Sequence, residues 1–370
     1  MKKYQIKPAC FLCNTPFQLI NSIAIVQEKQ LEADIYIFGM FDGYKRVADK
    51  LKKYNIFSRV ISVDCTKFSN LSEKRAFSQC LFTKKVVSDF LGEGIAYQKL
   101  FVSSRMHIKQ IFQHEMQRRN KDLKIIIFED GLGTYEKSSS VLNTSLKRKM
   151  VELLLNWHLF EQNNTSVLVS RPELLELPVA LSSVPVKKMP SFAWNQSNKN
   201  MVLDIFTVTQ NDLIKEPVIL FDPTRGTYVN DLGVQIDKLD QCYNIFFNVF
   251  KKENVICKPH PRSKIKTSVQ LKLYERTEIP MEVLYSGMDN LENRILVGNW
   301  STALYTPKML FDKEPVIIDL HKLLYKEDFH IASSLYKKMH TIYDNQSRIM
   351  APKSFEELHT ICQHLANVLL

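Results

Sequence analysis

Two adjacent carboxylates, Glu129 and Asp130, end an apolar run in the stretch IIIFEDGLGTY at 125–135. Adjacent side chains leaving a strand point to opposite faces, so one acid can face a binding site while the other braces the loop. Two close carboxylates in a half-buried site repel, which raises the pKa of one of them and suits a general base. Gly131 leaves room there for a substrate. Taken alone, however, the motif favours an ordinary acidic turn.

A histidine between two prolines follows a second apolar run, in VICKPHPRSK at 255–264. The prolines restrict the backbone around His260 and present its imidazole from a stiff, extended loop. An imidazole with the guanidinium of Arg262 close behind it suits a phosphate monoanion or diester. The alternative is a surface His-Pro turn, but two prolines at the end of a buried strand favour the phosphate site.

A third loop, RILVGNWSTALY at 294–305, gives way to a helix at Ser301 and Thr302. An ordinary helix N-cap explains these residues. The same geometry offers backbone N–H groups and hydroxyls to an anion, which the helix dipole also favours. Together with the histidine loop one strand earlier, it suggests two halves of one phosphate site.

Two weaker loops also follow apolar runs. Asn14 and Thr15 in CNTPFQLINS fit a helix cap, and Asp222 follows the run VILF. We expect all three residues to line the same binding region.

Short apolar runs alternate with longer amphipathic stretches, which predicts parallel sheets joined by right-handed helical crossovers. The expected strands are 8–13, 34–38, 58–63, 99–103, 124–128, 217–221, 254–258, 294–298 and 315–319. The expected helices include 15–29, 44–53, 105–119, 145–157, 235–252 and 303–311. Ligands of such sheets gather at the carboxyl ends of the strands, where the loops above lie.

The chain has 370 residues, more than one hydrophobic core normally serves, so two domains are expected. The alternation breaks between about 160 and 200, in a stretch with four prolines that we interpret as the passage between them. The predicted domains are 1–190 and 200–353, followed by a helix at 354–370 that packs back on the N-terminal domain.

The net charge of +11 suits a polyanionic partner, such as nucleic acid, acidic lipid or acidic polysaccharide, and a solvated basic surface explains it equally well. No nucleic-acid-binding motif accompanies the basic clusters. The seven scattered cysteines indicate reduced thiols. Because no signal peptide or membrane-spanning run is present, the protein is expected to be cytoplasmic or peripheral on the inner membrane face, where it can contact acidic lipid.

The acidic pair with its glycine, the His260-Pro261 pair and the Ser301-Thr302 pair, in this order, resemble the motifs of two related bacterial families. One contains lipooligosaccharide sialyltransferases and the other contains capsule polysialyltransferases. The longer match EDGLGTY is most similar to the polysialyltransferases, whereas PHPR is the form found in the lipooligosaccharide branch. The junction NTPFQL also looks like the first-strand loop of these families.

This resemblance implies a GT-B fold, in which two doubly wound Rossmann-like domains face a central cleft. It implies inverting transfer of sialic acid from CMP-sialic acid to a hydroxyl of lipooligosaccharide, O-antigen or capsule, on a lipid-linked or capsular acceptor. The acceptor would bind the N-terminal domain and the CMP-sugar the C-terminal domain. No nucleic acid, cofactor or metal is implied, and no DxD-like pair is placed to hold a metal.

In this mechanism Asp130 or Glu129 takes the proton from the acceptor hydroxyl, and we favour Asp130. Asp222 is a loose counterpart of an aspartate associated with catalysis in the lipooligosaccharide branch. The donor side is expected to neutralise the phosphate of CMP and to bind its oxygens and ribose. Its expected members are His260, Arg262, Lys258, Ser301, Thr302 and Glu282.

Two other functions remain open from the sequence. One is a different cytidine-nucleotide transferase of envelope polymers, using CMP-Kdo or CDP-glycerol, against which the Glu-Asp-Gly motif argues. The other is a non-enzymatic polyanion-binding protein, which the positive charge suggests.

Overall fold

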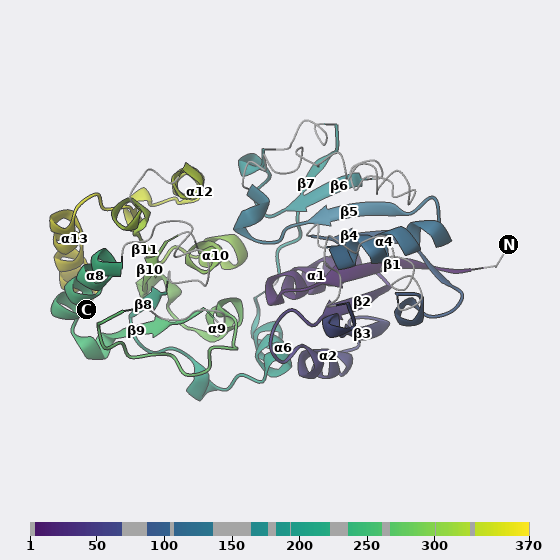
Figure 1. Cartoon of the computed structure of the whole chain (residues 1–370), viewed down its shortest axis with the longest axis horizontal. Coiled ribbons are helices and arrows are strands. Elements are labelled where there is room, and N and C mark those ends of the chain that lie inside the picture. The colour runs from purple at the N-terminus through teal and green to yellow at the C-terminus, as the bar shows by residue number, and fades with distance from the viewer. Residues whose placement is uncertain are drawn as a thin grey trace. The chain divides into compact units, whose positions relative to one another are not determined.

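The fold is seen in a computed structural model that forms two compact units, Met1–Ala193 and Trp194–Leu370 (Figure 1). The residues that the structure describes are 4–68, 87–103, 107–135, 164–176, 183–192, 194–222, 236–260, 267–299, 301–325 and 330–369.

The first unit is built on a sheet of seven strands in the order β3-β2-β1-β4-β5-β6-β7, and every neighbouring pair is parallel. The strands are β1 (Gln5–Cys13), β2 (Ala33–Phe38), β3 (Arg59–Val63), β4 (Ile95–Val102), β5 (Lys124–Phe128), β6 (Asn164–Val169) and β7 (Val186–Lys188). The order reverses between β1 and β4, so the chain leaves these two strands in opposite directions. The carboxyl ends at such a switch point form the usual ligand crevice of an open α/β sheet.

The helices of this unit connect the strands. They are α1 (Pro16–Lys29), α2 (Tyr44–Lys52) and α4 (His107–Arg119), with 3-10 helices η1 (Cys65–Phe68), η3 (Leu132–Tyr135) and η5 (Pro172–Leu174). Thr15 caps α1 by accepting a hydrogen bond from the N–H of Gln18 at 3.2 Å. Residues Ile108, Phe112 and Met116 of α4 pack in an apolar cluster against alternate side chains of the central strands. That packing fixes α4 beside β4 and β5, which matters for the site below.

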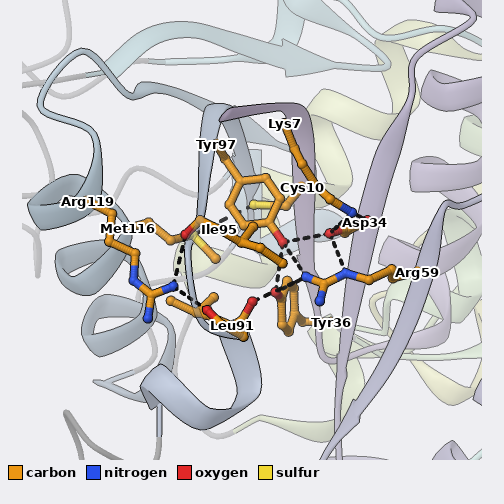
Figure 2. A network of polar contacts seen from close by, with 11 residues as sticks. Lys7, Cys10, Asp34, Tyr36, Arg59, Leu91, Ile95, Tyr97, Met116 and Arg119 are labelled. Carbon is orange, nitrogen blue, oxygen red and sulfur yellow. Dashed lines mark hydrogen bonds and ion pairs between the residues drawn. The ribbon is translucent and has the colours of Figure 1, made fainter. Parts of the chain in front are cut away.

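A charged network lies near the amino ends of β1, β2, β3 and β4, away from the carboxyl ends of these strands (Figure 2). The fully buried Asp34 accepts hydrogen bonds from Lys7 at 3.0 Å, from Arg59 at 2.8 Å and from the Tyr97 hydroxyl at 2.7 Å. A buried carboxylate needs such compensation, because its desolvation costs several kcal/mol in an apolar interior. The network therefore ties β1, β2, β3 and β4 together at the edge opposite to the one where ligands are expected.

The second unit contains a five-stranded parallel sheet in the order β12-β11-β10-β8-β9, with its switch point between β8 and β10. Its strands are β8 (Val218–Phe221), β9 (Val255–Lys258), β10 (Ile295–Gly298), β11 (Val316–Asp319) and β12 (Ile349–Met350). Its helices are α6 (Gln196–Phe206), α8 (Ile236–Phe250), α9 (Met281–Gly287), α10 (Thr302–Phe311), α11 (His321–Leu324), α12 (His330–Ile342) and α13 (Phe355–Leu369). The 3-10 helices are η7 (Gln210–Asp212), η8 (Lys252–Asn254), η9 (Leu291–Asn293) and η10 (Gln346–Arg348).

Within this unit α8 and α13 cover one face of the sheet, whereas α9 and α10 lie on the other (Figure 1). The last helix, α13, was expected from the sequence to pack back on the N-terminal domain. Instead its buried residues Leu358, Cys362 and Leu365 belong to the core of the second unit, together with Phe246 of α8. The apolar stripe of α13 is thus buried by the helix and sheet of its own unit.

Each strand expected from the sequence overlaps an observed strand. The passage expected at 160–200 is different, because β6 and β7 lie in it and extend the first sheet. The edge strand β7 is short and polar, and its neighbour β6 begins with three polar residues, so neither shows a clear periodicity and the sequence reads as a linker there. The helix expected at 145–157 lies outside the described residues. No helix in the described ranges combines the length and apolar character that crossing a bilayer requires.

Candidate active site

Asp130 lies directly beyond the carboxyl end of β5, on a tight turn. Its backbone N–H donates a hydrogen bond to Oγ1 of Thr134 at 2.9 Å, and the Thr134 N–H donates to the carbonyl of Gly131 at 3.0 Å. Gly131 has φ of +94°, a conformation that residues with a side chain rarely adopt. The glycine of the acidic motif therefore allows the chain to turn immediately after the acid and leaves the Asp130 carboxyl half-buried.

Gln18, in the first turn of α1, holds the Asp130 carboxyl. The Gln18 side chain is fully buried, and its Nε2 donates a hydrogen bond to Oδ1 of Asp130. Its Oε1 accepts from the backbone N–H of Asn14 at 2.9 Å and from Nζ of Lys109 at 3.2 Å. Two donors on one oxygen determine the orientation of the amide, so its NH2 group must face the carboxylate.

Lys109 lies in the first turn of α4 and is only 1% exposed. Its second hydrogen bond goes to Oγ of Ser103, which directly follows β4, at 3.2 Å. Burial lowers the pKa of Lys109 to about 8, although the neighbouring Cys13 and Asp130 favour its charged form. Burial raises the pKa of Cys13 to about 12, so this thiol is neutral at physiological pH.

Opposing effects act on the pKa of the Asp130 carboxyl. Burial raises its pKa, whereas the hydrogen bond from Gln18 and the charge of Lys109 lower it. A general base works best when its pKa approaches the working pH and it still reaches the substrate. The Asp130 carboxyl is partly exposed, and burial on one side and Gln18 and Lys109 on the other shift its pKa in opposite directions.

Glu129, in contrast, is 0% exposed and braces the loop from inside. Its Oε2 accepts hydrogen bonds from the Tyr135 hydroxyl at 2.9 Å and from the Ser170 N–H at 2.6 Å. Burial raises its pKa, which these two hydrogen bonds partly oppose. Glu129 is therefore enclosed in the loop, whereas the Asp130 carboxyl is partly exposed, and the role of Asp130 as the base stays a prediction.

In the second unit Lys258 ends β9, and its Nζ donates to the carbonyl of Thr277 at 2.8 Å while lying 5.1 Å from the centre of the Tyr274 ring. Burial lowers its pKa to about 8, and the charges of Glu278 and Glu282 oppose this shift. Burial raises the pKa of Glu282, in the first turn of α9, which Lys258 in turn opposes. Lys258 and Glu282 are therefore electrostatic neighbours.

The other expected site residues of this unit follow the carboxyl ends of β8, β9 and β10. His260 is half-buried two residues after β9, and Asp222 is buried directly after β8. Ser301 precedes α10, where its side chain makes no capping hydrogen bond, and Thr302 begins that helix. Arg262 lies outside the described residues.

The helix α10 that carries these hydroxyls is anchored by a buried aspartate that sequence reasoning missed. Asp319, at the end of β11, accepts from the Tyr305 hydroxyl at 2.6 Å and contacts Nδ1 of His321 at 2.9 Å. A second hydrogen bond, from the Tyr285 hydroxyl to the carbonyl of Ala303 at 2.8 Å, ties the start of α10 to α9. The start of α10 is thus fixed from two sides.

Gln18 and Lys109 were also missed, for different reasons. Gln18 stands three residues after Thr15 in the pattern of a capping box, so its type is explained by helix capping alone. Lys109 begins an amphipathic helix, where lysines normally reach into water. Within the described residues no three histidine, cysteine, aspartate or glutamate side chains gather as metal ligands would.

A family model for alpha-2,8-polysialyltransferases (POLYST) matches residues 10–222, more than half of the chain. The chain belongs to the alpha-2,8-polysialyltransferase family. The matched region includes Gln18, Lys109 and Asp130, so the whole arrangement around the acid lies inside it. As a member of this family the protein is a glycosyltransferase of the sialyltransferase class. No curated protein sequence matches the chain.

The fold agrees with this family. The structure is similar to the crystal structure of CalG4, the calicheamicin glycosyltransferase, with a TM-score of 0.50 at 9% sequence identity, over 98% of this chain and 90% of that chain. At this identity the likeness concerns the fold alone. It confirms the predicted GT-B class with two parallel α/β domains.

Proposed function

We propose that this protein transfers sialic acid from CMP-sialic acid to a hydroxyl of a bacterial surface glycan, with inversion at the anomeric carbon. The observation that carries the proposal is the Asp130 carboxyl, which the buried Gln18 amide holds at the carboxyl edge of the first sheet. Membership of the polysialyltransferase family supports a CMP-sugar donor and a glycan acceptor. The family's description further supports an acceptor that already ends in sialic acid. In our proposal this acceptor belongs to lipooligosaccharide, O-antigen or capsule.

In the proposed reaction Asp130 removes the proton from the acceptor hydroxyl as that oxygen attacks the anomeric carbon. The bond from the anomeric carbon to the phosphate oxygen breaks, and CMP leaves with the electron pair. Because attack and departure occur on opposite faces, the configuration inverts. The charge growing on CMP is met by His260, Arg262 and Lys258.

The remaining donor contacts in the proposal involve neutral or acidic groups. Ser301 and Thr302 bind the phosphate oxygens at the start of α10, and Glu282 binds the ribose hydroxyls. The support for this arrangement is that Lys258, Glu282 and the start of α10 belong to one unit and are held by defined contacts. No metal takes part in the proposed reaction, and the protein works at the inner face of the cytoplasmic membrane, where a lipid-linked acceptor is within reach.

The test is a donor and acceptor array. The purified protein is incubated separately with CMP-sialic acid, CMP-Kdo and CDP-glycerol, each with sialylated and unsialylated acceptors. Nucleotide release is measured, and products are analysed by mass spectrometry and by NMR of the new linkage. We expect CMP release and glycan extension only with CMP-sialic acid. Nucleotide release from another donor would refute the proposal. It would also be refuted if His260→Ala left the function unchanged while the protein bound polyanions in a salt-sensitive way.

A further inference from the structure

Lys109 is a buried cation that forms no ion pair with any residue that the structure describes. Its side chain is 1% exposed, and both of its hydrogen bonds go to neutral oxygens, on Gln18 and Ser103. In the described part of the chain no carboxylate lies within 4 Å of its Nζ. An ammonium group buried in this way costs free energy, since it gives up water for only two neutral acceptors. Such an arrangement is more typical of a functional site than of a stabilising contact.

The network around Lys109 connects three strand ends at the switch point of the sheet. Gln18 follows β1, Ser103 follows β4 and Asp130 follows β5, and Lys109 bonds the first two directly. Among the described residues, the Gln18 amide alone is hydrogen-bonded to both Lys109 and Asp130. Lys109 therefore reaches the acid through one hydrogen-bonded amide.

We propose that Lys109 is a positioning residue for Asp130: by donating to Oε1 of Gln18, it keeps the NH2 group of that amide directed at the carboxylate. The inference rests on the proposed role of Asp130 as the base. With Lys109 present, a flipped Gln18 would direct its NH2 group at an ammonium and at the Asn14 N–H, and its oxygen at a carboxylate. Each of these contacts is repulsive, so the productive orientation is strongly preferred.

Lys109 also acts on the acid by its charge. Its ammonium lowers the pKa of Asp130, which burial raises. The other titratable groups at this place are Cys13, whose thiol is neutral, and Glu129, whose carboxyl is turned to Tyr135 and Ser170. Removal of the Lys109 charge should therefore leave Asp130 protonated up to a higher pH, because no other described cation replaces it at this carboxyl.

The test compares Lys109→Met, which keeps the length of the side chain without its charge, with Lys7→Met in the same unit. Lys7 belongs to the Asp34 network at the opposite ends of the strands, so its loss reports on the removal of a part-buried lysine alone (Figure 2). For Lys109→Met we expect kcat to fall by roughly tenfold to a hundredfold, with little change in KM for donor and acceptor. The acid limb of the pH profile should move up by about one pH unit. Lys7→Met should leave that limb in place.

A second measurement separates positioning from general damage. In an Asp130→Asn background, Lys109→Met should cost less than about twofold in the residual rate, because the carboxylate on which it acts is gone. Thermal unfolding of every variant checks that the fold survives. Additive losses, an unmoved acid limb, or a large rise in KM for either substrate would overturn the inference while leaving the proposed function intact. If Asp130→Asn itself transfers at the wild-type rate, the proposed base is wrong, and the role of Lys109 falls with it.

Discussion

Gln18 and Asp130 are joined by a hydrogen bond between the amide Nε2 of one and the carboxylate Oδ1 of the other, although 112 residues separate them in the chain. The contact joins the first helix of the chain to the loop after β5. It exists because β1 and β5 flank β4 in the same sheet and end at the same edge. The chemistry of the acid thus depends on a residue that the local sequence explains as a helix cap.

Asp130→Asn is expected to abolish most transfer while CMP binding persists. A positioned general base typically contributes about 10²–10⁴-fold to the rate, and the amide cannot accept the proton. The measurement pairs single-turnover transfer with calorimetric titration of CMP. Loss of CMP binding along with activity would show that the acid belongs to the donor site instead.

Glu129→Gln is expected to affect stability more than catalysis, with a fall in rate of less than about tenfold. Because burial raises the pKa of Glu129, the folded protein binds this proton more tightly than the unfolded chain. Stability therefore falls as the pH rises from the ordinary range of a glutamate to the raised pKa. The variant should show a smaller fall over that interval in urea unfolding at several pH values, and an unchanged pH dependence would contradict this account.

Gln18→Met is expected to destabilise the protein by roughly 2–4 kcal/mol, because it removes one of the two hydrogen bonds of the buried Lys109 and the hydrogen bond that the Gln18 amide donates to the Asp130 carboxyl. Transfer should fall with it. Gln117→Met is a matched control, since the Gln117 side chain is also buried and its Nε2 has no described hydrogen-bond partner. Denaturant unfolding measures the loss in the free energy of unfolding for both variants. Equal losses would show that the Gln18 network contributes nothing to stability.

The lowered pKa of Lys258 leads us to expect that donor binding depends on pH. Its pKa is lowered to about 8, so the ammonium loses its proton as the pH rises through that value. The affinity for CMP is expected to fall by about tenfold from pH 7 to pH 9, the worth of one charged hydrogen bond. Lys258→Met should bind weakly throughout, whereas Lys272→Met, at a half-exposed surface ion pair with Glu216, should follow the wild type. A parallel fall in Lys258→Met would assign the titration to another group.

Metal removal gives a separate check on the chemistry. Since His260 and the start of α10 are proposed to meet the charge of the leaving CMP, dialysis against EDTA is expected to leave the transfer rate unchanged. Restoration of a lost rate by Mg²⁺ or Mn²⁺ would assign part of that charge to a cation.

Much of the fold follows from the sequence. The nine strands expected from apolar runs are found, because a strand buried on both faces by helices must be apolar along its length. The strands β6 and β7 were missed because β7 is a short polar edge strand and β6, its neighbour, begins with three polar residues. The predicted site residues were chosen by similar reasoning, because the acidic, histidine and hydroxyl motifs each follow a buried strand.

What the sequence determined by itself was therefore local: which segments are strands, where each ends, and that Glu129 and Asp130 divide into one bracing and one accessible acid. Only the tertiary structure decided that Gln18 and Lys109 join Asp130. Their meeting depends on the strand order β1-β4-β5 and on the packing of α4, which are set by burial summed over a whole sheet. No short sequence pattern predicts the burial of a whole sheet. The buried lysine and the glutamine of the helix cap therefore become part of the candidate site only in the folded protein.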